Sequence, residues 1–127
     1  MARLLDESKR SVHTGTLLDF LVYGLKVVFP AELGGMARGI PTAWSAEPLS
    51  REIHSDEAVV WSHPNGTMRG STLAPLYASA PEAALSDPSL HRMLALTDAL
   101  RIGKVRETRL AQAHLKEIFD GYALAKS

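Results

Sequence analysis

The chain has 127 residues, of which 46% are hydrophobic and 22% charged, with 14 basic residues, 14 acidic residues and no cysteine. This length favours one domain, 1–127, that can bury a core of its own. A net charge of zero argues against a protein that coats nucleic acid, and the absence of cysteine excludes disulfide scaffolds, thiolate metal sites and cysteine nucleophiles.

The charges are distributed unevenly along the chain. Residues 1–29 have four basic and three acidic groups, residues 30–90 have three and seven, and residues 91–127 have seven and four. Two interpretations stay open: the charges form ordinary solvated faces, or an acidic middle and a basic end contact different partners or each other across a dimer.

The N-terminal sequence does not resemble a secretory signal, because charged residues occupy the place of the apolar segment. The most apolar stretch, Leu17 to Phe29, is shorter than the roughly 20 residues that a transmembrane helix needs. We therefore expect a cytoplasmic protein with no membrane partner.

Two elements are expected in the first 29 residues. Residues 3–13 favour a short hairpin with the charged tip Asp6 to Arg10. A helix capped by Thr14 or Thr16 is predicted to run to Phe29. Because apolar residues cover most of its circumference, we expect this helix to be the buried centre of an α+β, mainly helical domain.

The middle of the chain is predicted to contain little regular structure. Residues 30–57 contain three prolines and three glycines and read as a loop with at most a turn of helix, either functional or pinned to the surface by its apolar residues. Residues 58–61 are a predicted strand, Asn65 and Gly66 a turn, and residues 67–69 the returning strand of a small hairpin.

The C-terminal part has clear helix signals. Asp87 is the predicted cap and Pro88 the first residue of a helix that ends or bends at Gly103. A second helix is predicted from about Lys104, with Gly121 as its natural end. Together they form a helical hairpin or one long kinked helix.

No arrangement of residues has the spacing of a catalytic or metal site. His54, Asp56 and His63 come nearest to a metal-ligand set, but their spacing matches no motif with a geometric reason, so we expect no specific metal there. The glycine-rich segment 34–39 lacks the lysine and serine of a phosphate-binding loop. We therefore predict a non-catalytic protein without a cofactor.

Basic residues gather in the predicted C-terminal hairpin and at the tip of the N-terminal one. They form either a solvated surface or a set of contacts to DNA phosphates. The residues expected to contact phosphate are Lys9, Arg10, Arg101, Lys104, Arg106 and Arg109.

Residues 2–35, ARLLDESKRSVHTGTLLDFLVYGLKVVFPAELGG, resemble the passage from the wing of a bacterial winged helix-turn-helix (MarR-like) domain into a following helical domain. Three further segments are similar to the accessory region of these regulators: GIPTAW (39–44), APLYASAPEAA (74–84) and LTDALRIGKVRE (96–107). The resemblance implies that residues 1–13 are a remnant wing and residues 14–127 a helical accessory and oligomerisation region.

The resemblance further implies a bacterial transcription regulator, in which this region fixes the spacing of two DNA-reading heads. The helix-turn-helix would precede Met1, so the chain is expected to be a fragment, or a form without its reading head, that recognises duplex DNA only in the full-length context. Two alternatives stay open: a protein-interaction module such as an antitoxin-like partner, and a small-molecule sensor whose pocket wall includes residues 30–57, Trp44 and Trp61.

A two-fold homodimer is expected to form through the C-terminal helices. The last predicted helix has apolar residues on more than one face, so one face can pack inward while another meets a second copy; the alternative is that the loop 30–57 covers it. The residues expected at the dimer interface are Leu110, Leu115, Ile118, Phe119 and Tyr122.

Overall fold

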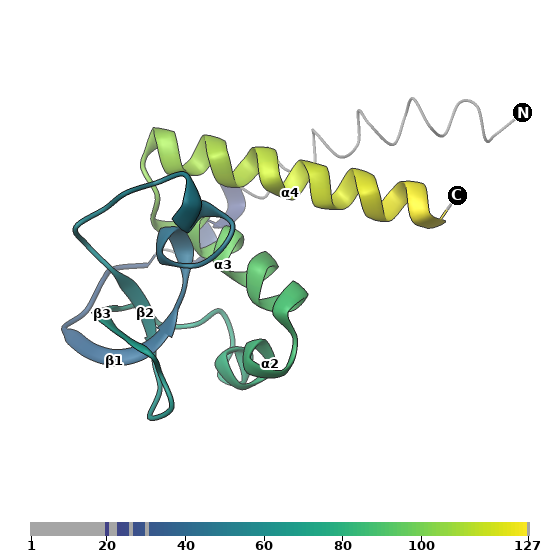
Figure 1. Ribbon diagram of the computed structural model, residues 1–127. Coiled ribbons are helices and arrows are strands. Elements are labelled where there is room, and N and C mark those ends of the chain that lie inside the picture. Colours follow the sequence, from purple (N-terminus) through teal and green to yellow (C-terminus); the bar gives the residue numbers. More distant parts are fainter. Residues whose placement is uncertain (1–19, 21–22, 26, 30, 127) are drawn as a thin grey trace, which may run out of the picture.

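The computed structural model describes residues 20, 23–25, 27–29 and 31–126, with side chains as far as residue 121. The fold is α+β and mainly helical, as predicted. Figure 1 shows the strands on one side of the molecule, α3 through the middle, α4 across the top and α2 below. The hairpin expected at residues 3–13 lies outside the described residues, and in the described part no helix is long and apolar enough to cross a membrane.

The central helix of the fold is α3 (Pro88–Ile102). It begins as the sequence predicts: the Asp87 carboxylate accepts hydrogen bonds from the backbone amides of Ser89 and Leu90, and Pro88 is the first helical residue. Gly103 is its C-cap. Nearly every residue from Leu94 to Arg101 is buried, so α3 is packed on all sides over its second half.

Helix α4 (Val105–Lys126) packs against α3 and completes the predicted helical hairpin. Thr108, Ala111 and Leu115 follow one another at helical spacing and face the core. The predicted end at Gly121 is wrong, because the helix continues to Lys126. A glycine in a helix costs only about 1 kcal/mol relative to alanine, so it weakens the helix without ending it.

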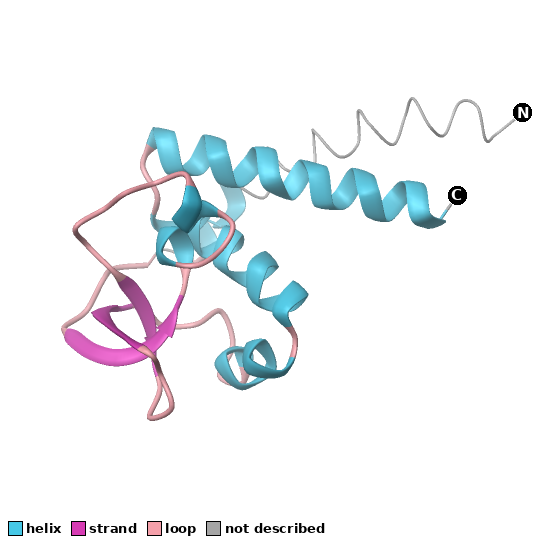
Figure 2. Cartoon of the chain, viewed as in Figure 1, coloured by secondary structure: helices cyan, strands magenta, loops and turns pink. Residues whose placement is uncertain are grey.

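The strands β1 (Met36–Pro41), β2 (Val59–Ser62) and β3 (Met68–Thr72) form a small closed barrel, coloured magenta in Figure 2. Both β2 and β3 pair antiparallel with β1 and parallel with each other. The predicted strands at 58–61 and 67–69 are confirmed, but they do not form an antiparallel hairpin. The prediction that residues 30–57 have no regular structure is wrong, because β1 lies among their glycines.

Gly39 is the residue at which β1 changes partner. It lies opposite Met68 of β3 and also opposite Ser62 of β2. A Cβ atom added at Gly39 would overlap the carbonyl oxygen of Trp61, and one added at Gly66 would overlap the backbone of Gly39 itself. The barrel therefore closes through direct backbone contact that only glycine permits at these two positions.

The segment between β1 and β2 contains two short 3-10 helices, η1 (Ala43–Ser45) and η2 (Leu49–Arg51). Trp44, Leu49 and Ile53 are buried, so the segment is pinned to the fold by its apolar residues. Ala43, also buried, has a φ of 52°, a left-handed conformation that an L-residue rarely adopts. The Glu47–Pro48 peptide bond is cis.

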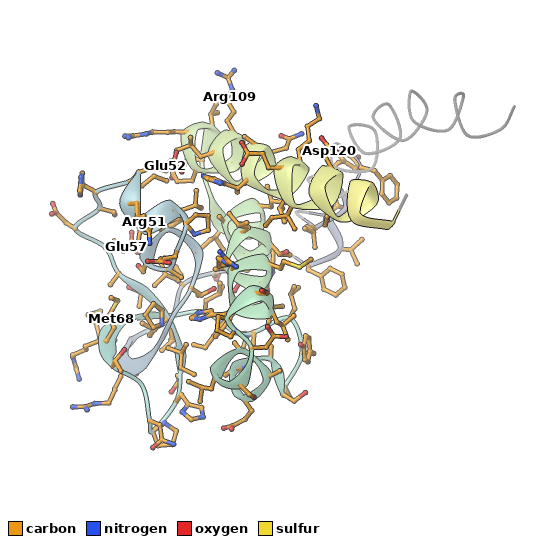
Figure 3. The ribbon with its side chains drawn as sticks, turned by 45° about the vertical axis from the view of Figure 1, so that its right-hand side comes forward. Arg51, Glu52, Glu57, Met68, Arg109 and Asp120 are labelled. Atoms are coloured by element: carbon orange, nitrogen blue, oxygen red, sulfur yellow. The ribbon has the colours of Figure 1, made fainter. Side chains whose placement is uncertain are left out.

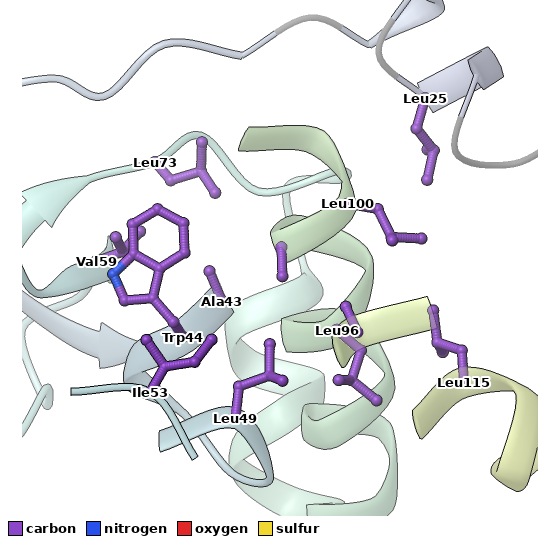
Figure 4. Packing of buried hydrophobic residues seen from close by; sticks show 12 residues of the cluster. Leu25, Ala43, Trp44, Leu49, Ile53, Val59, Leu73, Leu96, Leu100 and Leu115 are labelled. Carbon is purple, nitrogen blue, oxygen red and sulfur yellow. The ribbon is translucent and has the colours of Figure 1, made fainter. Parts of the chain in front are cut away.

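Two apolar clusters form the core. The larger one joins this segment and β2 to α3 and α4, and Figure 4 shows Leu49, Leu96, Leu100 and Leu115 within it. The smaller one lies between the barrel, the short helix α2 (Ala80–Ser86) and the start of α3, where Trp61 is its largest member. Most of the buried apolar side chains thus gather around α3.

The helix predicted to end at Phe29 is confirmed for residues 20, 23–25, 27 and 28, which are helical. The prediction that it is the buried centre of the fold is wrong for the described residues. Leu25 joins the core, whereas Phe20, Tyr23 and Val27 are exposed. Most of the described apolar residues of this segment therefore lie at the surface.

Candidate functional site

A buried polar junction joins the barrel to α3. The Asp98 carboxylate, only 1% exposed, accepts hydrogen bonds at Oδ2 from the Thr42 hydroxyl (2.7 Å) and from Trp61 Nε1 (2.9 Å). Its Oδ1 accepts one from the Arg101 guanidinium (2.8 Å). One acidic side chain therefore connects the residue after β1, the middle of β2 and one turn of α3.

Burial raises the pKa of Asp98 above its ordinary value of 3.8, while the hydrogen bonds from Thr42, Arg101 and Trp61 act in the opposite direction. Among the described residues, no buried side-chain nitrogen or oxygen lacks a hydrogen-bond partner. Because its oxygens are already engaged by internal donors, this junction holds the fold together and offers no free group for chemistry.

Arg101 belongs to this junction and not to an exposed basic surface, so its predicted contact with DNA phosphate is wrong. Its side chain is buried, and besides Asp98 it donates to the carbonyl oxygens of Ala74 (3.1 Å) and Phe29 (3.4 Å). The bond to Phe29 ties the end of the segment 20–29 to α3. A basic residue in a helical sequence gives no signal of such burial, which depends on the acidic partner one turn earlier.

The segment held in this way presents an apolar surface, which we call the outer face. It consists of Phe20 (70% exposed), Tyr23 (71%), Val27 (60%), Val28 (66%) and Phe29 (47%). Large apolar side chains scattered singly over a surface are ordinary, but a contiguous group is typical of an interaction site.

Helical geometry separates Phe20, Tyr23 and Val27 of the outer face from the anchored side of the segment. Phe20 and Val27 are seven residues apart and so lie on the same side of a helix, whereas Leu25 lies about 140° round from Phe20. Figure 4 shows Leu25 directed from this segment toward Leu100 and the core. Leu25 and Arg101 therefore fix the segment from within while its apolar outer face stays in solvent.

The described residues of the predicted dimer interface on α4 lie in the core or pack against it. Leu115 is 2% exposed and belongs to the core, so that prediction is wrong for Leu115. Leu110, Ile118 and Phe119 are partly buried and pack against the same core. The side chain of Tyr122 lies outside the described part. Among the described residues, the largest group of exposed apolar side chains lies on the segment 20–29 and not on the face of α4 that the spacing favoured.

Three of the predicted phosphate contacts are exposed near the start of α4. They are Lys104, Arg106 and Arg109. Arg106 also donates to the Glu52 carbonyl (3.4 Å), and Figure 3 shows Arg109 pointing away from the body of the molecule. Lys9 and Arg10 lie outside the described residues. The exposed basic group at the start of α4 is thus smaller than predicted, because Arg101 is buried in the junction.

Two exposed arginines that the sequence analysis missed face each other on the barrel. Arg38 of β1 and Arg69 of β3 are opposite partners in the antiparallel ladder, and both are exposed. No sequence signal could place them together, because they are 31 residues apart and β1 itself was not predicted.

The structure also places the residues of the sensor and metal alternatives. Trp44 lines a surface hollow of about 350 Å³ together with His54 and Asp56, whereas Trp61 is buried inside the fold and forms no wall of it. His63 pairs with Glu82 of α2. In the described part of the chain, no three histidine or acidic residues are grouped as metal ligands.

Comparisons of the chain with protein-family models, with curated proteins and with solved structures gave no match.

Proposed function

We propose that this chain is the non-catalytic accessory and dimerisation region of a bacterial winged helix-turn-helix transcription regulator that acts in the cytoplasm. The observation that carries the proposal is the outer face, on which large apolar side chains stay exposed although the helix bearing them is anchored to the core. Its proposed occupant is the same face of a second copy, related by a two-fold axis.

The area of the outer face fits this role. A buried aromatic side chain covers about 150–250 Å², so the exposed fractions of Phe20, Tyr23 and Phe29 amount to roughly 300–500 Å² per copy. A standard interface buries about 800 Å² per partner. The aromatic residues therefore supply about half of what a stable dimer needs, and Val27 and Val28 lie beside them to extend the contact.

The anchoring of the segment suits a spacer. Arg101 holds the carbonyl of Phe29 and Leu25 enters the core, so two paired segments would carry their domains at a fixed separation. The residues that resemble a wing, 1–13, precede this segment in the chain. Pairing at this place would bring the two DNA-reading heads of a longer regulator near the symmetry axis, which is how half-site spacing is set.

Sedimentation velocity over a concentration series tests the proposal. At micromolar concentration the wild-type chain is expected to sediment as a dimer, with twice the mass of one chain. The Phe20→Asp variant is expected to shift the equilibrium to the monomer, because pairing would bury an unpartnered carboxylate. Val105→Asp is the matched control, since Val105 is 68% exposed but lies at the start of α4. A wild-type chain that stays monomeric would contradict the dimer and leave the outer face to a different protein.

A further inference from the structure

The outer surface of the β1–β3 pair carries two arginines in direct register. Arg38 lies opposite Arg69, and one step along the same face Met36 lies opposite Ser71. The Ser71 hydroxyl contacts Met36 Sδ at 3.8 Å, which places these side chains on one side of the ladder. Because opposite residues have Cβ atoms about 5 Å apart, the two guanidinium groups project from neighbouring points.

This arrangement is unfavourable in the isolated chain. Like charges directly opposite one another destabilise a sheet. In the described structure, Arg51 pairs with Glu47 and Arg101 with Asp98, but neither Arg38 nor Arg69 has a side-chain hydrogen bond or an ion pair with a described residue. Two unpaired guanidinium groups at this spacing favour the binding of an anion.

We propose that Arg38 and Arg69 together bind the phosphate backbone of duplex nucleic acid. Guanidinium groups bind phosphate oxygens through parallel N–H donors, and two of them side by side can hold one phosphate or two successive ones. Both arginines are exposed on the outer surface of the closed barrel, where a phosphate backbone can contact them without a strand entering a groove.

This contact positions nucleic acid without reading its sequence. The outer surface of the β1–β3 pair offers guanidinium groups, the Ser71 hydroxyl and an exposed methionine, and phosphate contacts of this kind carry no base information. The site is on the barrel, whereas the basic group of Lys104, Arg106 and Arg109 is at the start of α4, so the two sets can be separated by mutation. The inference does not require the chain to dimerise.

Fluorescence anisotropy with a labelled duplex of mixed sequence, measured over a salt series, tests the proposal on the full chain. Each phosphate contact adds about 0.9 to the slope of log K against log salt, so the variant R38Q/R69Q is expected to have a slope lower by about 1.8. Those two contacts alone correspond to an approximately 12-fold fall in affinity between about 50 and about 200 mM salt. R38K/R69K, which keeps both charges, is expected to keep the wild-type slope.

The matched control is Arg92→Gln, which removes an exposed arginine of α3 that has no partner among the described residues. It is expected to leave the slope unchanged. The melting temperature of R38Q/R69Q should equal or exceed that of the wild type, since a repulsion is removed. The proposal is overturned if the wild type does not bind the duplex at low salt, if R38Q/R69Q keeps the wild-type slope, or if R38Q/R69Q melts lower and thereby shows a structural role.

Discussion

The junction around Asp98 and the outer face of the segment 20–29 place their residues in opposite ways. At the junction, an acid and a base are buried with every described donor and acceptor paired. On the outer face, aromatic and branched apolar residues are exposed although they lie on a helix that touches the core. From hydropathy alone, the charged pair would be expected at the surface and the apolar residues in the interior, which is the opposite of what the structure shows.

Arg101 connects the two regions. Its guanidinium is bound by Asp98 on one side and binds the carbonyl of Phe29 on the other. The buried charge therefore has a consequence at the surface, because it fixes the helix that presents the apolar residues. The buried polar contacts of Arg101 thus hold in place the segment that exposes apolar side chains.

The largest expected effect follows from breaking the junction. Asp98→Ala would leave the Arg101 guanidinium buried without its counter-charge and the Thr42 and Trp61 donors without an acceptor. We expect the free energy of unfolding to fall by about 3–5 kcal/mol in urea titrations. Asp56→Ala, at an exposed position, should change it by less than about 0.5 kcal/mol; equal effects of the two substitutions would refute the role of the junction.

A smaller loss is expected from the barrel that supplies Thr42 and Trp61. Gly39→Ala places a methyl group on the Trp61 carbonyl, so the strands must move apart, with an expected cost of about 1–3 kcal/mol. Gly35→Ala is the matched control, because nothing lies within 4 Å of the added carbon. Thermal unfolding of both variants measures the difference, and a Gly39→Ala protein as stable as Gly35→Ala would contradict the closed barrel.

The junction should also give a pH dependence of definite sign. Because burial raises the pKa of Asp98 in the folded state above 3.8, the folded protein holds this proton more tightly than the unfolded chain does. The contribution of this group to stability is complete below the unfolded pKa and is lost as pH rises through the folded pKa. The stability of the wild type relative to Asp98→Asn is therefore expected to fall as pH increases above 3.8, and a rise would show the opposite shift.

The smallest effect on folding is expected at the outer face. Phe20→Ser removes an aromatic ring that solvent already surrounds, so the unfolding free energy of the dissociated chain should change by less than about 0.5 kcal/mol. Leu25→Ala, on the anchored side of the same segment, should cost about 2–5 kcal/mol. Denaturation at low protein concentration distinguishes the two, and a large loss for Phe20→Ser would show that its ring is part of the core.

Local signals in the sequence predict some elements well and the centre of the fold poorly. The cap at Asp87, the proline after it and Gly103 define α3 because each acts on the backbone next to it. The same signals do not show that α3 is the central helix, since its burial of Asp98 and Arg101 depends on Thr42 and Trp61, which are distant in the chain.

The arginine pair on the barrel and the outer face were not predicted from the sequence, because both depend on contacts between residues that are distant in the chain. The strand β1 is not visible in a sequence punctuated by Gly34, Gly35 and Gly39, and its register with β3 is what brings Arg38 to Arg69. Apolar periodicity placed residues 17–29 inside the fold, although such a pattern fits an interface between two copies equally well. In this fold α3 and α4 already fill the positions around the core, so the described residues of this segment lie mostly at the surface.

Disulfide trapping is the most direct test of the central claim that two copies meet through the outer face. The chain has no cysteine, so single cysteines at positions 20, 23, 27 and 28 report only on contacts of the introduced thiol. Under mild oxidation, at least one of these variants is expected to form a covalent dimer rapidly at micromolar concentration, while Val105→Cys, equally exposed on α4, does not. Cross-linking at Val105→Cys as fast as at the four outer-face positions, or at none of the five, would contradict the claim.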